Sequence, residues 1–145
     1  MMSSDCRIVT VERRLTAVIK TEPAFAQIPE VQRSSRGKLG TLLRQLDCGP
    51  LGATCTRWTP PVDGKLPMEI GVIVAQTFAA KDDVVPSDLP AGRAVHFSMK
   101  GPFDGLPDAW HTVFTWCQTQ ALTPAGINWE IYGGEQDAEL YALLA

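Results

Sequence analysis

The stretch RAVHFSMKGPFDGLPDAWHTVFTWC, at residues 93–117, decides the fold. Its first part alternates large apolar residues, Val95, Phe97 and Met99, with Ala94, His96 and Ser98, which is the period of a half-buried strand. A Gly-Pro-Phe bend follows at 101–103. Beyond it, apolar residues recur at helical spacing, and Pro107 suits the first turn of a helix; they are Leu106, Trp110, Val113, Phe114, Cys117 and Ala121. The stretch therefore predicts a strand that turns into an amphipathic helix.

Two more strands complete the second half of the chain. Pro124 and Gly126 interrupt the helical pattern, and the run NWEIY at 128–132 has the aromatic and β-branched content of a strand. A Gly-Gly pair then leads to a last apolar strand at 138–144. This half is predicted to run strand, helix, strand, strand.

The first half follows the same plan. We expect a strand at 7–20, a helix at 30–47 and strands at 53–59 and 68–78, with the helix buried through Val31, Leu39, Leu42, Leu43 and Leu46. The charged, proline-containing run KDDVVPSDLPA at 81–91 is predicted to be a linker. The expected architecture is a single α+β domain over 1–145, with repeats at about 7–80 and 92–145. Together these repeats would form a six-stranded, mainly antiparallel unit with two main helices.

Matching spacings support an internal duplication. Pro50, Gly52 and Trp58 have the same offsets as Pro124, Gly126 and Tyr132. In this alignment Thr56 corresponds to Glu130, and Trp58 and Tyr132 become partners across a pseudo-twofold axis. The two halves then differ by one carboxylate.

Composition excludes several classes of function. The net charge is −3, and the basic residues are scattered, which disfavours a nucleic-acid partner; they include Arg7, Arg13, Arg14, Arg33, Arg36 and Lys38. The longest uncharged apolar run, at 70–80, is too short to span a bilayer. The four cysteines lack metal-ligand spacing and the first residues lack a signal peptide, so we expect a cytoplasmic protein with no metal and no cofactor.

The strongest candidate for a binding residue is Glu130. Strand alternation places Glu130 and Tyr132 on one face of 128–132, and a carboxylate among aromatic residues loses water unless a cation or a donor replaces it. With Trp58 as a further aromatic face, the pattern suits a cationic ligand. An ion pair between Glu130 and one of the chain's own arginines, at a sheet edge, fits the pattern equally well.

Other aromatic and histidine residues carry weaker signals. Trp110 suits the lining of a groove and the filling of a core equally, Phe103 lies in the bend and can cover a pocket or pin the turn, and Phe114 is expected to fill the core. His96 is expected to be solvated on a polar strand face. Neither histidine has a nucleophile at a motif spacing, and Glu69 and Glu139 are expected to face solvent.

Four short motifs, in this order, resemble the GyrI-like effector-binding family. They are LPAGR at 89–93, KGPF at 100–103, LTPAG at 122–126 and WEIY at 129–132. The resemblance runs from about Arg7 to Leu144. Members of this family occur fused behind DNA-binding regions and also alone, and this chain is similar to a member that stands alone.

The resemblance implies a groove between the repeats in which Glu130 meets a cationic ligand. We therefore expect an apolar, cationic small molecule, sequestered or sensed there; the expected ligand-binding residues are Glu130, Tyr132, Trp58, Trp110, Met99 and Phe103. Met99 and Phe103 stand where the family often has histidine and tyrosine, which makes the expected groove more apolar.

The resemblance also leaves two alternatives. Some similar proteins open cyclopropane-bearing toxins by hydrolysis, in which case Glu130 would orient or deprotonate water and Tyr132 would donate a hydrogen bond. Others act on a protein partner, as a gyrase inhibitor does. Each of these three functions remains a hypothesis at this point.

Overall fold

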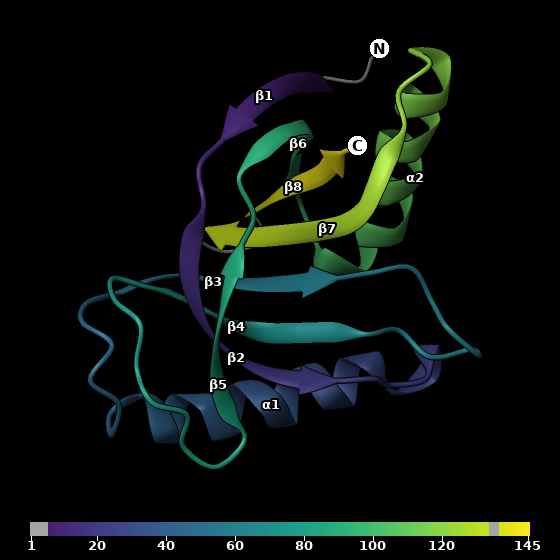
Figure 1. Cartoon of the computed structure of the whole chain (residues 1–145). Helices are drawn as coiled ribbons and strands as arrows, with labels where there is room; N and C mark the ends of the chain where they lie inside the picture. Colours follow the sequence, from purple (N-terminus) through teal and green to yellow (C-terminus); the bar gives the residue numbers. More distant parts are fainter. Residues whose placement is uncertain (1–5, 134–136) are drawn as a thin grey trace.

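The computed structural model describes residues 6–133 and 137–145, in which two helices cover one large antiparallel sheet (Figure 1). The described residues form eight strands: β1 Arg7–Val11, β2 Arg14–Thr21, β3 Leu51–Trp58, β4 Met68–Val74, β5 Val84–Leu89, β6 Gly92–Lys100, β7 Pro124–Gly133 and β8 Asp137–Leu144. The helices are α1 Ile28–Leu43 and α2 Leu106–Thr119, and short 3-10 turns, Phe25–Gln27 and Phe103–Gly105, precede them. The predicted α+β class is confirmed. No helix in the described ranges is long and apolar enough to cross a membrane.

The sheet has eight strands where six were predicted, in the order β1-β6-β8-β7-β3-β4-β2-β5. Every neighbouring pair is antiparallel. The single strand predicted at 7–20 is interrupted at residues 12 and 13, which divides it into β1 and β2. The second added strand, β5, lies within the segment that was predicted to be a linker.

Strand β5 was missed because its sequence mixes charge and proline with apolar residues. Val84 is fully buried, and Pro86 lies opposite Ala17 of β2. Since β5 is the last strand of the sheet, Pro86, which has no backbone N–H, interrupts no ladder to a further strand. A proline therefore marks an edge strand here, and the linker prediction was wrong over 84–89.

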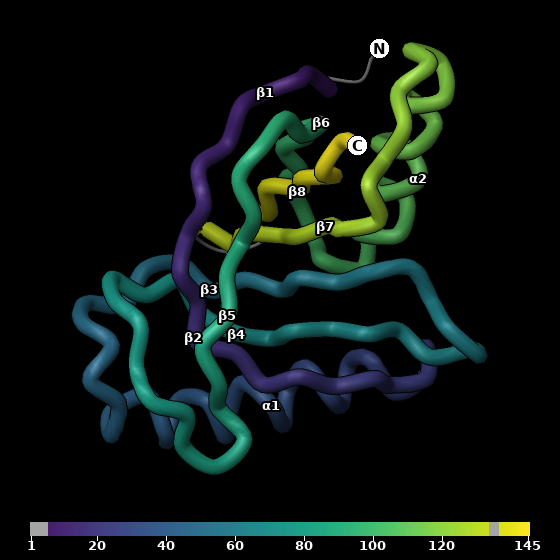
Figure 2. Tube along the Cα trace, in the orientation of Figure 1, coloured from purple at the N-terminus to yellow at the C-terminus, as the bar shows by residue number. Residues whose placement is uncertain are grey.

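Each half of the sheet receives an edge strand from the other half. Figure 2 shows β1 running on into β2, and β5 into β6, across the molecule. Yet β1 pairs with β6 while β2 pairs with β4, and β5 pairs with β2 while β6 pairs with β8. The halves are thus joined at three places, through β3 with β7 and through the two exchanged edges.

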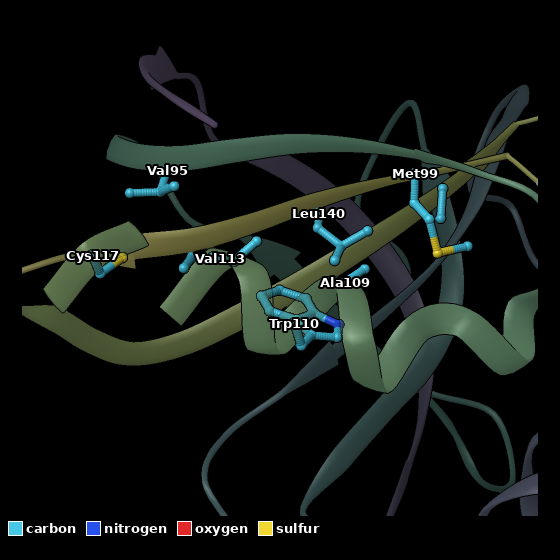
Figure 3. Packing of buried hydrophobic residues seen from close by; sticks show 9 residues of the cluster. Val95, Met99, Ala109, Trp110, Val113, Cys117 and Leu140 are labelled. Carbon is cyan, nitrogen blue, oxygen red and sulfur yellow. The ribbon is translucent and has the colours of Figure 1, made fainter. Parts of the chain in front are cut away.

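The two helices cover separate apolar clusters. Residues of α2 pack on β6 and β8 (Figure 3), and the buried members of this cluster include Val95, Met99, Trp110, Val113, Cys117 and Leu140. Residues of α1 pack on β2, β4 and β5, where Leu39 and Leu42 meet Ala17, Val72 and Val84. A third cluster contains Leu89, Ala94 and Trp129. Both faces of the central strands are therefore covered by apolar residues.

Candidate functional site

The candidate site lies where β3 and β7 pair at the middle of the sheet. Thr56 is directly opposite Glu130, and Trp58 is opposite Asn128. The sequence alignment relates Thr56 to Glu130, and a twofold axis that passed between the two antiparallel strands at this point would place them opposite each other. The duplication itself stays a prediction.

Glu130 is a buried carboxylate held by two side-chain donors. Only 8% of the surface of Glu130 is exposed. The indole Nε1 of Trp110, on α2, donates to Oε2 at 2.6 Å, and the Tyr132 hydroxyl donates to Oε1 at 2.5 Å. Each carboxylate oxygen therefore has a donor in place of water.

Burial raises the pKa of the Glu130 carboxyl, and the hydrogen bonds from Tyr132 and Trp110 and the positive charge of Arg36 offset part of that rise. Burial also raises the pKa of Tyr132 well above its ordinary value, and the neighbouring Glu130 carboxylate adds to that rise. The phenol therefore keeps its proton and donates a hydrogen bond to the carboxylate.

Helix α1 contacts the same site through Thr56 of β3. Gln32 Nε2 lies 3.2 Å and Arg36 Nη2 lies 3.0 Å from Thr56 Oγ1, and both donate to that oxygen. The Tyr132 hydroxyl is 2.9 Å from the same oxygen. Because Tyr132 contacts both Thr56 and Glu130, α1 and α2 lie on the same face of the sheet, on either side of the β3–β7 pair.

The single proton on each hydroxyl fixes which group donates in the hydrogen bonds of Thr56 and Tyr132. A hydroxyl has one proton, so when Tyr132 donates to Glu130, the hydroxyl of Thr56 supplies the proton between Thr56 and Tyr132. Thr56 Oγ1 then still accepts from Gln32 and Arg36. The chain of hydrogen bonds runs from a cation on α1 to a carboxylate on β7, and its members polarise each other.

Sequence reasoning missed Arg36 and Gln32. Arg36 was counted among scattered basic residues, but its guanidinium carbon lies 5.1 Å from the centre of the Tyr132 ring and its Nε donates to Gln32 at 3.1 Å. A signal was present, because Phe25–Pro29 (FAQIP) and Phe103–Pro107 (FDGLP) both place a 3-10 turn before a helix with proline in its first turn. Counting on from these prolines relates Gln32 to Trp110 and Arg36 to Phe114.

Three aromatic rings, of Trp58, Trp110 and Phe114, form an aromatic group beside the carboxylate. Trp58 and Trp110 meet edge to face with ring centres 5.0 Å apart, and Phe114 stacks on Trp110 at 5.6 Å. Trp58 also meets Phe114 at 6.2 Å. Phe114 was expected to fill the core; it is half-buried, packs against the cluster under α2 and also belongs to this group.

Of the six predicted ligand-binding residues, the structure brings four together: Glu130, Tyr132, Trp58 and Trp110. Phe103 is at the margin, 43% exposed, with its ring 5.4 Å from that of Tyr132. Met99 is buried in the cluster under α2 (Figure 3). Met99 is therefore part of the packing below the site.

The opposite face contains a second polar group, around His96. His96 was expected to be solvated, but only 7% of it is exposed, and its Nε2 lies 2.6 Å from Oε1 of Glu139. Ser98 donates to the same oxygen at 2.6 Å, and Tyr141 lies beside the imidazole with ring centres 4.9 Å apart. The prediction for His96 was wrong because a neighbouring strand supplies a partner that sequence alternation does not show.

Glu130 does not line either of two hollows in the molecule. One, of about 340 Å³, opens beside Trp58 and is also lined by Met68 and Pro67. The other, of about 600 Å³, lies between residues 45–47 and 76–81 and contains none of the predicted site residues. The carboxylate is covered in this conformation.

The chain matches a known protein family and several solved structures. A family model described as GyrI-like small molecule binding domain matches residues 4–142. No curated protein matches significantly. The EcmrR chain in its complex with DNA is 16% identical with a TM-score of 0.81; the match covers 99% of this chain and 58% of EcmrR, so this chain spans less than two thirds of that protein.

Two further structures have the same fold over nearly their whole length. SAV2435 bound to tetraphenylphosphonium is 18% identical, with a TM-score of 0.74 and with 97% of this chain and 94% of that chain covered. A hydrolase from Listeria innocua is 12% identical, with a TM-score of 0.63 and with 98% and 92% covered. At these identities the similarity shows the fold.

Proposed function

Because this chain belongs to the GyrI-like small molecule binding domain family, we propose that it binds an apolar, cationic small molecule between its two halves, against Glu130. The observation that carries the proposal is the Glu130 carboxylate, which is buried among aromatic rings and, within residues 6–133 and 137–145, is held by two neutral donors. Sequestration and sensing would both use such a site.

The physical reason is the cost of removing a carboxylate from water. Desolvation raises the pKa of Glu130, so its charged form is poorly compensated inside the protein. A cation placed beside it restores part of the lost solvation, and the faces of Trp58 and Trp110 add cation–π attraction. Apolar substituents on the cation would gain by covering the same rings.

Access to Glu130 requires a movement of side chains. Trp58 is half-buried beside the smaller hollow, and Phe103 is partly exposed beside Tyr132. We propose that these two residues open the site and then cover the ligand.

The fold relative SAV2435 supplies the first compound to test, since its structure holds tetraphenylphosphonium. This ion combines a delocalised positive charge with four aromatic rings. Thermal unfolding of the wild type should shift upward with tetraphenylphosphonium, since a ligand at one hundred times its Kd stabilises by about 2.7 kcal/mol.

Two carboxylates of the same chain provide a matched comparison. Glu130→Gln should lose most of the thermal shift, whereas Glu139→Gln, which changes a carboxylate bound to His96 and Ser98, should keep it. Equal shifts in the wild type and in both variants would remove Glu130 from the proposal.

Hydrolysis of a strained electrophile is the second candidate, favoured by the Tyr132–Glu130 hydrogen bond. A carboxylate with a raised pKa is a better base toward water. In such a reaction Glu130 accepts a proton from water and the water oxygen bonds to a cyclopropane carbon. The ring C–C bond breaks, its electron pair moves to an electron-accepting group on the substrate, and the proton held by Glu130 is then returned to that group. More than one product per protein molecule, with substrate in large excess, would support hydrolysis; stoichiometric protection alone would exclude it.

A further inference from the structure

The α1 side of the candidate site contains a cation with unused hydrogen-bonding capacity. Arg36 uses Nε for Gln32 and Nη2 for Thr56. Its remaining nitrogen, Nη1, is buried and has no hydrogen-bond partner among the described residues. The guanidinium therefore presents an unsatisfied donor group beside Tyr132, over whose ring it lies.

An unsatisfied guanidinium nitrogen favours an acceptor from outside the chain. Burying a donor without a partner is unfavourable, and more so for a charged group. The planar fork of arginine matches a carboxylate, which accepts two hydrogen bonds in one plane. The contacts to Gln32 and Thr56 also fix the orientation of the guanidinium before any ligand arrives.

The charges of the site are divided between the two halves. Glu130, on β7, is the acidic group, and Arg36, on α1, is the basic group, connected to it through Thr56 and Tyr132. A ligand with only a positive charge is attracted by Glu130 and repelled by Arg36. A ligand with both charges is attracted by both groups.

We infer that the ligand is an amphipathic zwitterion, in which an apolar cationic centre meets Glu130 and a carboxylate on a short arm meets Arg36. This inference rests on the proposed function and adds the anionic group. The carboxylate of the ligand also offsets the repulsion between Arg36 and the cationic centre. Arg36 thus acts as a specificity-determining residue.

Two phosphonium ions of nearly equal size test the inference. One is (4-carboxybutyl)triphenylphosphonium and the other is pentyltriphenylphosphonium, which has a methyl group in place of the carboxylate. Calorimetric titration of the wild type should give about tenfold tighter binding of the carboxylate compound, which is the scale of one charge-assisted hydrogen bond. Equal affinity, or a preference for the pentyl compound, would overturn the inference.

Variants at Arg36 assign the preference to that side chain. Arg36→Met should reverse the preference, because the ligand carboxylate would then lie near Glu130 without a partner. Arg36→Lys keeps the charge but not the fork and should retain only part of the preference. Arg33→Met is the matched control on the same helix, since Arg33 is 76% exposed and pairs with Glu30, and it should change nothing.

The outcomes separate this inference from the proposed function. If neither phosphonium ion binds the wild type, the cation site itself is wrong. If both bind with equal affinity and Glu130→Gln weakens both, only the carboxylate subsite is wrong. If Arg36→Met fails to fold, the wild-type preference and Arg36→Lys still decide.

Discussion

The α1 side and the α2 side of the site place different chemistry on either side of the β3–β7 pair. On the α1 side, Gln32 and Arg36 meet Thr56. On the α2 side, Trp110 meets Glu130, and Phe114 stacks on Trp110. The contacts also correspond across the site, because Arg36 lies over the ring of Tyr132 while Phe114 packs against Trp58.

The difference shows how two helices with similar beginnings contribute different side chains to one polar site. Each helix follows a 3-10 turn and has a proline in its first turn. The side chains on the α1 side are basic and polar, and those on the α2 side are acidic and aromatic. A ligand bound between the halves would contact both sets of side chains, and these side chains would decide the orientation of the ligand.

Reversing the charge of the α1 half should have the largest effect. Arg36→Glu removes the hydrogen bond from Arg36 to Thr56 and places a second carboxylate near Glu130, and a substitution that introduces an unpaired charge into a covered site can cost about 3 kcal/mol. We expect a fall of that size in the free energy of unfolding, measured with urea. The double variant Arg36→Glu with Glu130→Gln should recover most of it; a fall equal in the single and double variants would show that the two groups do not interact.

Removing the donor from the α2 half should have a smaller effect. Trp110→Phe keeps an aromatic ring but leaves Glu130 Oε2 without its hydrogen bond. A hydrogen bond to a charged group contributes about 2 kcal/mol, and we expect the free energy of unfolding to fall by that amount. Trp58→Phe, which changes a ring contact in the same aromatic group, serves as control and should cost less than half as much.

Breaking the connection between the halves should cost less again. Thr56→Val preserves shape but removes the hydroxyl that joins Gln32 and Arg36 to Tyr132. We expect a loss of about 1.5 kcal/mol in urea unfolding, the lower end of the range for a hydrogen bond to a charged group such as Arg36. Thr56→Ser, which keeps the hydroxyl, should stay close to the wild type, and equal losses in both variants would argue against the relay.

The pH dependence of stability gives the smallest and most specific effect. Burial raises the folded-state pKa of Glu130 above the ordinary value of 4.5, so its contribution to stability is fully present below 4.5 and is lost as pH rises through the folded pKa. Glu130→Gln lacks this titration. The stability of the variant relative to the wild type should therefore increase as pH rises above 4.5, as measured by urea unfolding at several pH values, and a constant difference would contradict the raised pKa.

Much of the fold could be predicted from periodicity. Both helices and the strand around Glu130 followed from local patterns and spacings. The sequence alignment related Thr56 to Glu130, and their direct pairing is a finding of the structure. Strand β5 could not be predicted, because the segment that contains Val84 and Pro86 has the charge and proline content of a loop. Only the folded chain shows that it pairs with β2. The pairing of β1 with β6 and of β5 with β2 joins segments that are far apart in the sequence, and alternation within one strand does not predict such pairings.

The candidate site was predicted in part, for a similar reason. Glu130, Tyr132, Trp58 and Trp110 stood out as a carboxylate and aromatic residues on apolar segments. Arg36 did not, because an arginine on a helix is usually solvated, and its role depends on contacts to Thr56 and Tyr132 that only the folded chain brings together.

The indole N–H signals provide the most direct test of the central claim, that a cationic ligand binds at Glu130 between the halves. The chain has four tryptophans, so a ¹⁵N–¹H spectrum contains four indole signals, which substitution to phenylalanine assigns. Titration with tetraphenylphosphonium should move the signals of Trp110 and Trp58 and leave that of Trp129, which packs in the third cluster, unchanged. Thermal stabilisation by the ion with no movement of the Trp110 and Trp58 signals would contradict the account.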